Sequence, residues 1–233
     1  LKATANFAGI VGLDVLDLSA TGISVEYNTV NNPNNPLDRA VVDFEESFPD
    51  PDGNGDEVAG YALDTGSGEL ILDFSSKILR ASVDDALLRI EDYVFVRGSL
   101  AFEKGAVHAV DLTTGTVPTN VVATNIGAED VTMFFGTNGP YWNDLNGDGE
   151  VQPEELNDNA VGLAVSNADV AITILKPTLA DNPKYIGVKA TADQVGFVGS
   201  DVFEFGASSV VVELNLVTGP GTSSITPVVD FAS

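Results

Sequence analysis

The sequence predicts an elongated, all-β protein, built either as a β-solenoid or as tandem β-sandwich modules. Segments such as "GELILDF", "YVFVRGSLAFE", "DVAITIL" and "VVVELNLV" are rich in Val, Ile and Phe and partly alternate, as half-buried strands do. Turn segments rich in Gly, Pro, Asn and Asp separate them. In addition, a long stretch of the chain returns at a fixed offset, which is typical of tandem arrays.

The repeat has an offset of 187 residues. "LKATANFAGIVGLDV" from Leu1 aligns with "VKATADQVGFVGSDV" from Val188, and "VVDF" from Val41 aligns with "VVDF" from Val228. The ungapped alignment holds 19 identities over 46 positions, more than shared β composition produces. We therefore expect one complete tandem repeat unit at 1–187 and the first quarter of the next at 188–233.

Two architectures stay open. In a parallel β-solenoid, tandem units would lengthen a rod of short strands, whereas antiparallel sandwiches of roughly 90 residues each would also accommodate long loops. "VDDALLRI", at 83–90, is the one internal stretch that could form a helix, and its β-branched surroundings favour a strand. We expect at most one short helical turn, at "PEEL" from Pro153.

The charge of the chain is strongly acidic, with 35 Asp and Glu against 10 Lys and Arg and a formal net charge of -25. Such a chain would repel nucleic acid, which we therefore exclude as a partner. Bound divalent cations would offset the internal repulsion. The sequence has no cysteine and no uninterrupted apolar stretch of about 20 residues, so we expect neither disulfides nor membrane insertion. The start at Leu1 indicates a mature fragment or a piece of a longer protein.

The segment "DLNGDGEVQPEE" has the spacing D-x-[DN]-x-[DN]-G-x5-E of a calcium loop. A hard cation takes six to eight oxygen ligands, and alternate residues of a tight turn direct theirs inward. A solvated turn without an ion is the alternative, but it gives no reason for the carboxylate that closes the pattern. The expected ligands of Ca²⁺ are Asp144, Asn146, Asp148, the carbonyl of Glu150, Gln152 and, with both oxygens, Glu155.

Over these twelve residues the chain resembles the calcium loop of EF-hand and dockerin modules. The segment "FFGTNGPYWN" before the loop indicates a strand and a turn instead of an entering helix. We therefore interpret the loop as one placed between two strands. A sensor that opens a groove on binding calcium would need the missing flanking helices.

A second acidic loop, "DPDGNGDE", places carboxylate and amide oxygens at alternate positions. Tyr61 falls where a closing carboxylate should be, which favours a plain hydrophilic hairpin. The possible second metal ligands are Asp50, Asp52, Asn54 and Asp56.

Catalysis is not indicated. The single histidine, His108, lies in a strand pattern without a nucleophile motif or zinc spacing, so we expect it at the surface. A secreted glycoside hydrolase would need only two close carboxylates and is the third alternative. The second alternative function, ranked above the hydrolase, is a carbohydrate-binding or adhesion module. In it Trp142 and Tyr141 would stack on a sugar, although we favour packing of Trp142 against the sheet.

The whole chain resembles tandem units of giant secreted or cell-surface proteins of Gram-negative bacteria, including calcium-dependent adhesins. The segments that carry this resemblance are "GFVGSDVFEFGASSVVVELN", "GSLAFEKG" and "NGPYWNDLNGDGE". The resemblance implies a non-enzymatic structural repeat of an extracellular surface protein or filament, rigidified by calcium. Its partners would be neighbouring repeats of the same chain or identical chains, with glycans or another surface as further partners.

Overall fold

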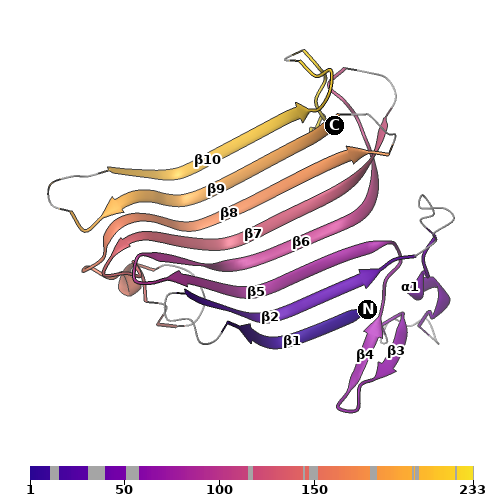
Figure 1. Ribbon diagram of the computed structural model, residues 1–233, viewed down its shortest axis with the longest axis horizontal. Coiled ribbons are helices and arrows are strands. Elements are labelled where there is room, and N and C mark those ends of the chain that lie inside the picture. Colours follow the sequence, from indigo (N-terminus) through magenta and orange to yellow (C-terminus); the bar gives the residue numbers. More distant parts are fainter. Residues whose placement is uncertain are drawn as a thin grey trace.

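The computed structural model describes residues 1–10, 16–30, 40–50, 58–114, 118–143, 145–146, 152–178, 183–200, 202, 205–223 and 225–232. Strands dominate this part of the chain, and the predicted all-β class is confirmed. Most strands join one broad sheet, while a short hairpin forms a second, small sheet (Figure 1).

The broad sheet is an antiparallel meander with the strand order β1-β2-β5-β6-β7-β8-β9-β10. Figure 1 shows that these strands lie side by side in almost their sequence order and curve along their length. Long runs of β-branched and apolar residues favour such extended strands. The eight strands are β1 (Lys2–Gly9), β2 (Leu16–Asn28), β5 (Ile78–Ile90), β6 (Val94–Val110), β7 (Thr119–Thr137), β8 (Val161–Pro177), β9 (Lys184–Val198) and β10 (Phe205–Thr218).

The connection from β2 to β5 carries the small sheet, formed by β3 (Tyr61–Asp64) and β4 (Glu69–Leu72), and the helical turn α1 (Phe44–Ser47). The Asp43 carboxylate caps α1 by accepting a hydrogen bond from the Glu46 amide at 2.9 Å. Aromatic contacts between Phe44 and Phe74 and between Phe48 and Tyr61 pack this segment together, with ring centroids 6.0 and 4.9 Å apart.

The strand directions decide between the two predicted architectures. Each pairing in the two sheets is antiparallel, so the parallel β-solenoid is wrong for the described residues. Antiparallel pairing and a second sheet agree with the sandwich alternative, although the two sheets are very unequal in size. "VDDALLRI" lies in β5, as predicted, and the 3-10 turn η1 (Pro153–Glu155) confirms the predicted helical turn. The turn α1 was not predicted.

Five strands contain a residue with positive φ near their middle, where the sheet has bulges or irregular pairing. Such backbone is costly for residues with a Cβ atom and free of cost for glycine. A Cβ at Gly98 would lie 2.9 Å from Val131 Cα on the neighbouring strand. These residues are Gly22 in β2, Gly98 in β6, Asp130 in β7, Asn167 in β8 and Ser209 in β10.

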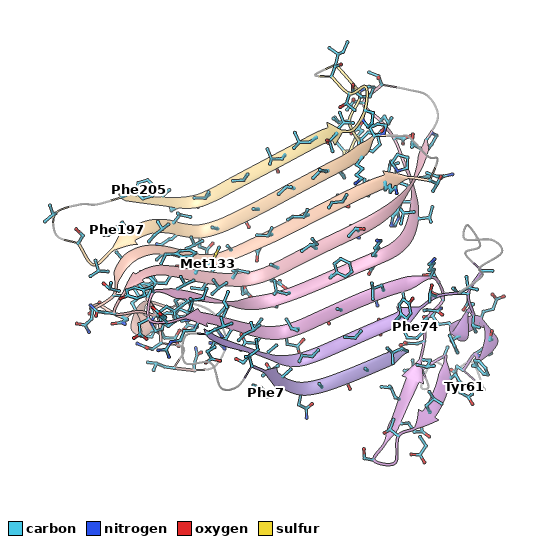
Figure 2. All side chains as sticks on the ribbon, in the orientation of Figure 1. Phe7, Tyr61, Phe74, Met133, Phe197 and Phe205 are labelled. Atoms are coloured by element: carbon cyan, nitrogen blue, oxygen red, sulfur yellow. The ribbon has the colours of Figure 1, made fainter. Side chains whose placement is uncertain are left out.

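Within the described ranges, buried residues gather in small separate clusters instead of one continuous core. One cluster contains Phe134 and Trp142, another contains Val121 and Tyr185, and a third surrounds Ala168. Figure 2 shows side chains crowded at both ends of the strands and sparser across the middle of the sheet. The accessible surface is 14528 Å², against about 10,000 Å² for a compact monomer of this mass. The sheet is therefore a largely single-layered, extended structure.

The hairpins at the two ends of the sheet have the same register. Lys2 lies opposite Glu26 in β1–β2, and Lys189 lies opposite Glu213 in β9–β10. Adding 187 to both members of any β1–β2 pair gives a β9–β10 pair. The offset found in the sequence thus relates the first hairpin of the sheet to the last.

Candidate functional site

The predicted calcium loop connects β7 to β8, and backbone hydrogen bonds close its base. The Asn143 amide donates to the Glu155 carbonyl at 2.7 Å, and the Asn157 amide donates to the Tyr141 carbonyl at 2.7 Å. Between these bonds, Trp142 and Leu156 form an isolated antiparallel bridge. The two ends of the loop are therefore held in a short ladder that resembles the start of a hairpin.

The side chain of Asn157 strengthens this base. Its amide nitrogen donates to the carbonyls of Asn138 and Pro140 at 2.9 and 2.8 Å. Its side-chain oxygen accepts a hydrogen bond from the Asn159 amide at 3.1 Å. One side chain thus ties the segment before the loop, at Asn138 and Pro140, to the segment after it.

Trp142 anchors the loop to the sheet. It is 4% exposed and packs with Phe95, Phe134, Ala160 and Ala164. The predicted packing role is confirmed, because the indole lies inside a core cluster. With 4% of its surface exposed, the ring offers little area on which a sugar could stack.

Glu155 is a buried carboxylate at the end of the loop, with an exposed fraction of 2%. Its Oε1 accepts hydrogen bonds from the Leu145 amide at 2.8 Å and the Asn146 amide at 3.3 Å. Its Oε2 is also buried and has no hydrogen-bond partner among the described residues. A buried carboxylate oxygen without a donor is costly, and a bound cation would remove that cost.

The turn η1 places this carboxylate. Pro153 stands at the start of the turn, where its missing N–H costs nothing, and the Glu155 amide donates to the Gln152 carbonyl at 3.0 Å. The turn directs Glu155 back toward the first residues of the loop, as position 12 of a calcium loop requires. The buried Oε2 therefore fits a cation ligand.

The remaining predicted ligands are only partly described. Asn146 is exposed and Gln152 is half-buried, and both lie in the described part of the loop. Asp144, Asp148 and Glu150 lie outside the described residues. Across the described ranges, no three or more His, Cys, Asp or Glu side chains gather as a metal-binding group. The calcium site itself stays a prediction that rests on the sequence pattern and on Glu155.

The second acidic loop is also mostly outside the described ranges. Asp50 is described and half-buried, whereas Asp52, Asn54 and Asp56 are not described. The predicted second metal site is therefore neither supported nor contradicted.

An ion-pair ladder that the sequence analysis missed crosses the first strands of the sheet. Lys2 Nζ lies 2.8 Å from Asp73 Oδ1 and 3.3 Å from Glu26 Oε1. On the other side of Glu26, the Arg80 guanidinium lies between two carboxylates. Its nitrogens are 2.8 Å from Glu26 Oε2 and 3.0 Å from Glu103 Oε2. Burial lowers the pKa of Lys2, but the hydrogen bonds and negative charges of Asp73 and Glu26 outweigh it, so the net effect raises this pKa.

The signal for this ladder was present in the repeat. Lys2 and Glu26 recur as Lys189 and Glu213, which also form an ion pair, at 3.1 Å. An opposite pair of charges that returns at the repeat offset indicates two residues facing each other across neighbouring strands.

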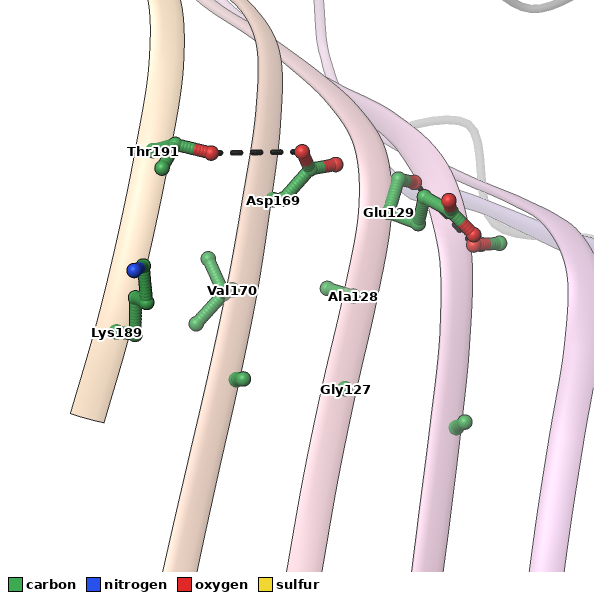
Figure 3. A pocket seen from close by; sticks show the side chains of 10 residues that line it. Gly127, Ala128, Glu129, Asp169, Val170, Lys189 and Thr191 are labelled. Carbon is green, nitrogen blue, oxygen red and sulfur yellow. Dashed lines mark hydrogen bonds between the residues drawn. The ribbon is translucent and has the colours of Figure 1, made fainter. Parts of the chain in front are cut away.

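A shallow depression lies on the face of the sheet, over β6 to β9 (Figure 3). Its floor consists of small residues, including Gly127 and Ala128, and its border carries Glu129, Asp169 and Lys189. Glu129 and Asp169 are both exposed. The depression is thus an open part of the sheet surface and differs from the deep cleft that a glycoside hydrolase needs.

His108 lies exposed on β6, opposite Val121 of β7. This position agrees with the predicted surface location. Among the described residues, no helix has the length and apolar character needed to cross a membrane.

No protein-family model, curated protein or solved structure matches the chain.

Proposed function

We propose that the chain is a non-enzymatic structural repeat of an extracellular bacterial surface protein or filament, rigidified by calcium at residues 144–155. The observation that carries this proposal is the common register of the hairpins β1–β2 and β9–β10 at the repeat offset. A sequence repeat that preserves strand pairing residue by residue is what an array of identical structural units requires.

The shape of the molecule supports a structural role. Among the described residues, the buried side chains form small clusters, two near the ends of the strands and one around Ala168 at their middle, and much of the sheet is open on the surface. An enzyme usually holds its substrate in a concave pocket lined by convergent polar groups. A broad sheet instead provides length and main-chain hydrogen bonds, which suit a spacer or filament.

Glu155 supports the calcium part of the proposal. Its Oε2 is buried without a partner among the described residues, and its Oε1 is held by the Leu145 and Asn146 amides. The expected ligands Asp144, Asp148 and Glu150 would bring further oxygens to the same loop. Because the base of the loop is tied to the Trp142 cluster, an ion there would couple the loop to the sheet and increase the rigidity of the unit.

The net charge of -25 favours an environment rich in divalent cations. Calcium is abundant outside cells, where even a moderately weak site stays filled. This charge supports the extracellular or cell-surface location and gives the ion a second effect, the reduction of repulsion within each unit.

Thermal unfolding in calcium and in EDTA tests the proposal. A calcium concentration 100 times Kd stabilises the folded state by about 2.7 kcal/mol, which raises Tm by roughly 5–10 °C for a domain of this size. Glu155→Gln should lose most of this calcium-dependent shift. The matched control is Glu154→Gln, since Glu154 is the exposed neighbour and should keep the shift. Equal melting temperatures in calcium and EDTA for the unmodified chain would contradict the calcium part.

A further inference from the structure

The two outer strands of the broad sheet are β1 and β10, and the repeat relates β10 to an interior strand. Because β9–β10 corresponds to β1–β2, β10 is the counterpart of β2. β2 has two neighbours, β1 and β5, whereas β10 pairs only with β9 among the described strands. One edge of β10 is therefore open where β2 holds a strand.

The pairing of β8 with β9 joins the first unit to the second. β8 ends at Pro177, inside the first unit, while most of β9 belongs to the second unit, which begins at Val188. β8 and β9 keep one register from Gly162–Val198 to Leu175–Tyr185. The sheet thus crosses the expected repeat boundary without an interruption.

Two polar side chains on β10 have fewer partners than their counterparts on β2. Glu26 pairs with Lys2 on one side and with Arg80 of β5 on the other, and its side chain is 11% exposed. Glu213 pairs with Lys189, no second cation approaches it among the described residues, and its side chain is 64% exposed. Glu213 thus lacks, among the described residues, a cation in the position that Arg80 occupies beside Glu26.

The second side chain is an asparagine. Asn28 donates to the Val42 carbonyl at 2.9 Å and to the Ser76 carbonyl, just before β5, at 3.0 Å. Asn215 donates to the Val229 carbonyl at 2.7 Å. The Asn215 side chain could therefore donate a second hydrogen bond, as Asn28 does to the Ser76 carbonyl. The acceptor would be the equivalent carbonyl of a segment that leads into a β5-like strand.

The apolar residues of β10 are also half-exposed. Val211, Val212, Leu214 and Leu216 have exposed fractions of 46–59%. A long exposed edge strand with apolar side chains is a template for pairing with another strand. Continuation of the sheet would cover this edge.

We infer that the outer edge of β10 binds the β5-type strand, equivalent to residues 78–90, of the unit that begins at Val188, so that successive units share one continuous antiparallel sheet. This inference rests on the proposed tandem array. The observed β2–β5 register, in which Val25 lies opposite Ala81, places Val212 opposite the equivalent of Ala81 in that unit. It also brings the equivalent of Arg80 in that unit to Glu213, as Arg80 meets Glu26 here.

The register also fixes how units follow one another. A row of directly opposite residues that starts at Glu26 passes through Arg80 and Thr173 and reaches Asn215, two residues beyond Glu213. An even displacement keeps corresponding side chains on the same face. Each unit contributes six strands to the sheet and extends it by roughly 29 Å across the strands.

The test lengthens the chain by one unit, so that residues 1–233 are followed by residues 47–233. The chain contains no cysteine, so any disulfide that forms must involve the engineered cysteines. Val212→Cys together with Ala81→Cys in the appended segment should form an intramolecular disulfide. It should form as completely as the disulfide between Val25→Cys and Ala81→Cys of residues 1–233, the pair already opposite in the structure.

The matched control pairs Val212→Cys with Ser82→Cys of the appended segment, which would point to opposite faces and should stay reduced. A reduced Val212–Ala81 pair beside an oxidised Val25–Ala81 pair would overturn the inference, and so would a disulfide between two separate chains. The assay is run in calcium and in EDTA. Disulfide formation without a calcium-dependent Tm shift would support the continuous sheet and reject the calcium proposal. A calcium-dependent Tm shift without disulfide formation would reject only the continuous sheet.

Discussion

The side chains of Asn28 and Asn215, 187 residues apart, make the same hydrogen bond. Asn28 donates to the Val42 carbonyl at 2.9 Å, and Asn215 donates to the Val229 carbonyl at 2.7 Å. Val42 and Val229 are themselves separated by the repeat offset. In each case the end of a strand holds the segment that carries the "VVDF" sequence, so the repeat preserves a long-range contact as well as the strand register.

Removing this amide should cost more stability in the interior of the sheet than at its edge. Asn28 is 8% exposed and serves two carbonyls, so Asn28→Ala leaves two acceptors without a donor and should cost about 1–3 kcal/mol. Asn215 is exposed and its loss should cost less than 1.5 kcal/mol. Urea unfolding of both variants measures the difference, and equal costs would contradict this explanation.

Ser209 and Gly22 occupy corresponding positions with positive φ, at 53° and 61°. Glycine adopts this backbone without the steric cost that serine bears, so Ser209→Gly should stabilise the fold by roughly 1 kcal/mol. Gly22→Ala should destabilise it by about 1–2 kcal/mol or more, because the added Cβ would also meet the Asp84 carboxylate. Thermal unfolding should shift in opposite directions for the two variants, and a lower Tm for Ser209→Gly would reject the argument.

Trp142 should matter for stability and not for sugar binding. Trp142→Ala removes a buried side chain from the cluster with Phe95 and Phe134, which should cost about 3–5 kcal/mol. Trp142→Phe should cost less and serves as the folded variant for binding assays. If the unmodified chain bound a glycan array and folded Trp142→Phe lost that binding at unchanged stability, the carbohydrate-binding alternative would replace the packing role.

The ion pairs of Lys2 predict a loss of stability at alkaline pH. Asp73 and Glu26 raise the pKa of Lys2 in the folded protein despite the opposing effect of burial. Its stabilising contribution is therefore complete below the unfolded pKa of about 10.4 and is lost as the pH rises through the folded pKa.

Lys2→Met should consequently flatten part of the fall in unfolding free energy above about pH 10. The matched control is Lys189→Met, since the Lys189 side chain is 65% exposed and its ion pair with Glu213 should contribute little to stability. Urea unfolding between neutral and alkaline pH measures both profiles. Identical profiles for Lys2→Met and the unmodified chain would contradict this role of Lys2.

The sequence was sufficient to predict the all-β class, the strand at 83–90 and the turn after the acidic loop, because these depend on local pattern and turn chemistry. The parallel solenoid was wrong because alternation within a strand does not report the direction of its neighbour. The turn α1 was missed because only four residues and the Asp43 cap define it. The spacing predicted a role for Glu155, whereas its buried, unpartnered oxygen depends on how the loop packs against the Trp142 cluster.

A crystal structure of the chain grown with calcium would show whether the ion binds the loop at residues 144–155, because the ion would be seen with its ligands. We expect a spherical density peak with Glu155 Oε2 at about 2.4 Å and with oxygens of Asp144, Asn146 and Asp148 completing a shell of six to eight ligands. A structure in which Glu155 Oε2 instead accepts a hydrogen bond from a protein donor or a water, with no ion in the loop, would contradict it.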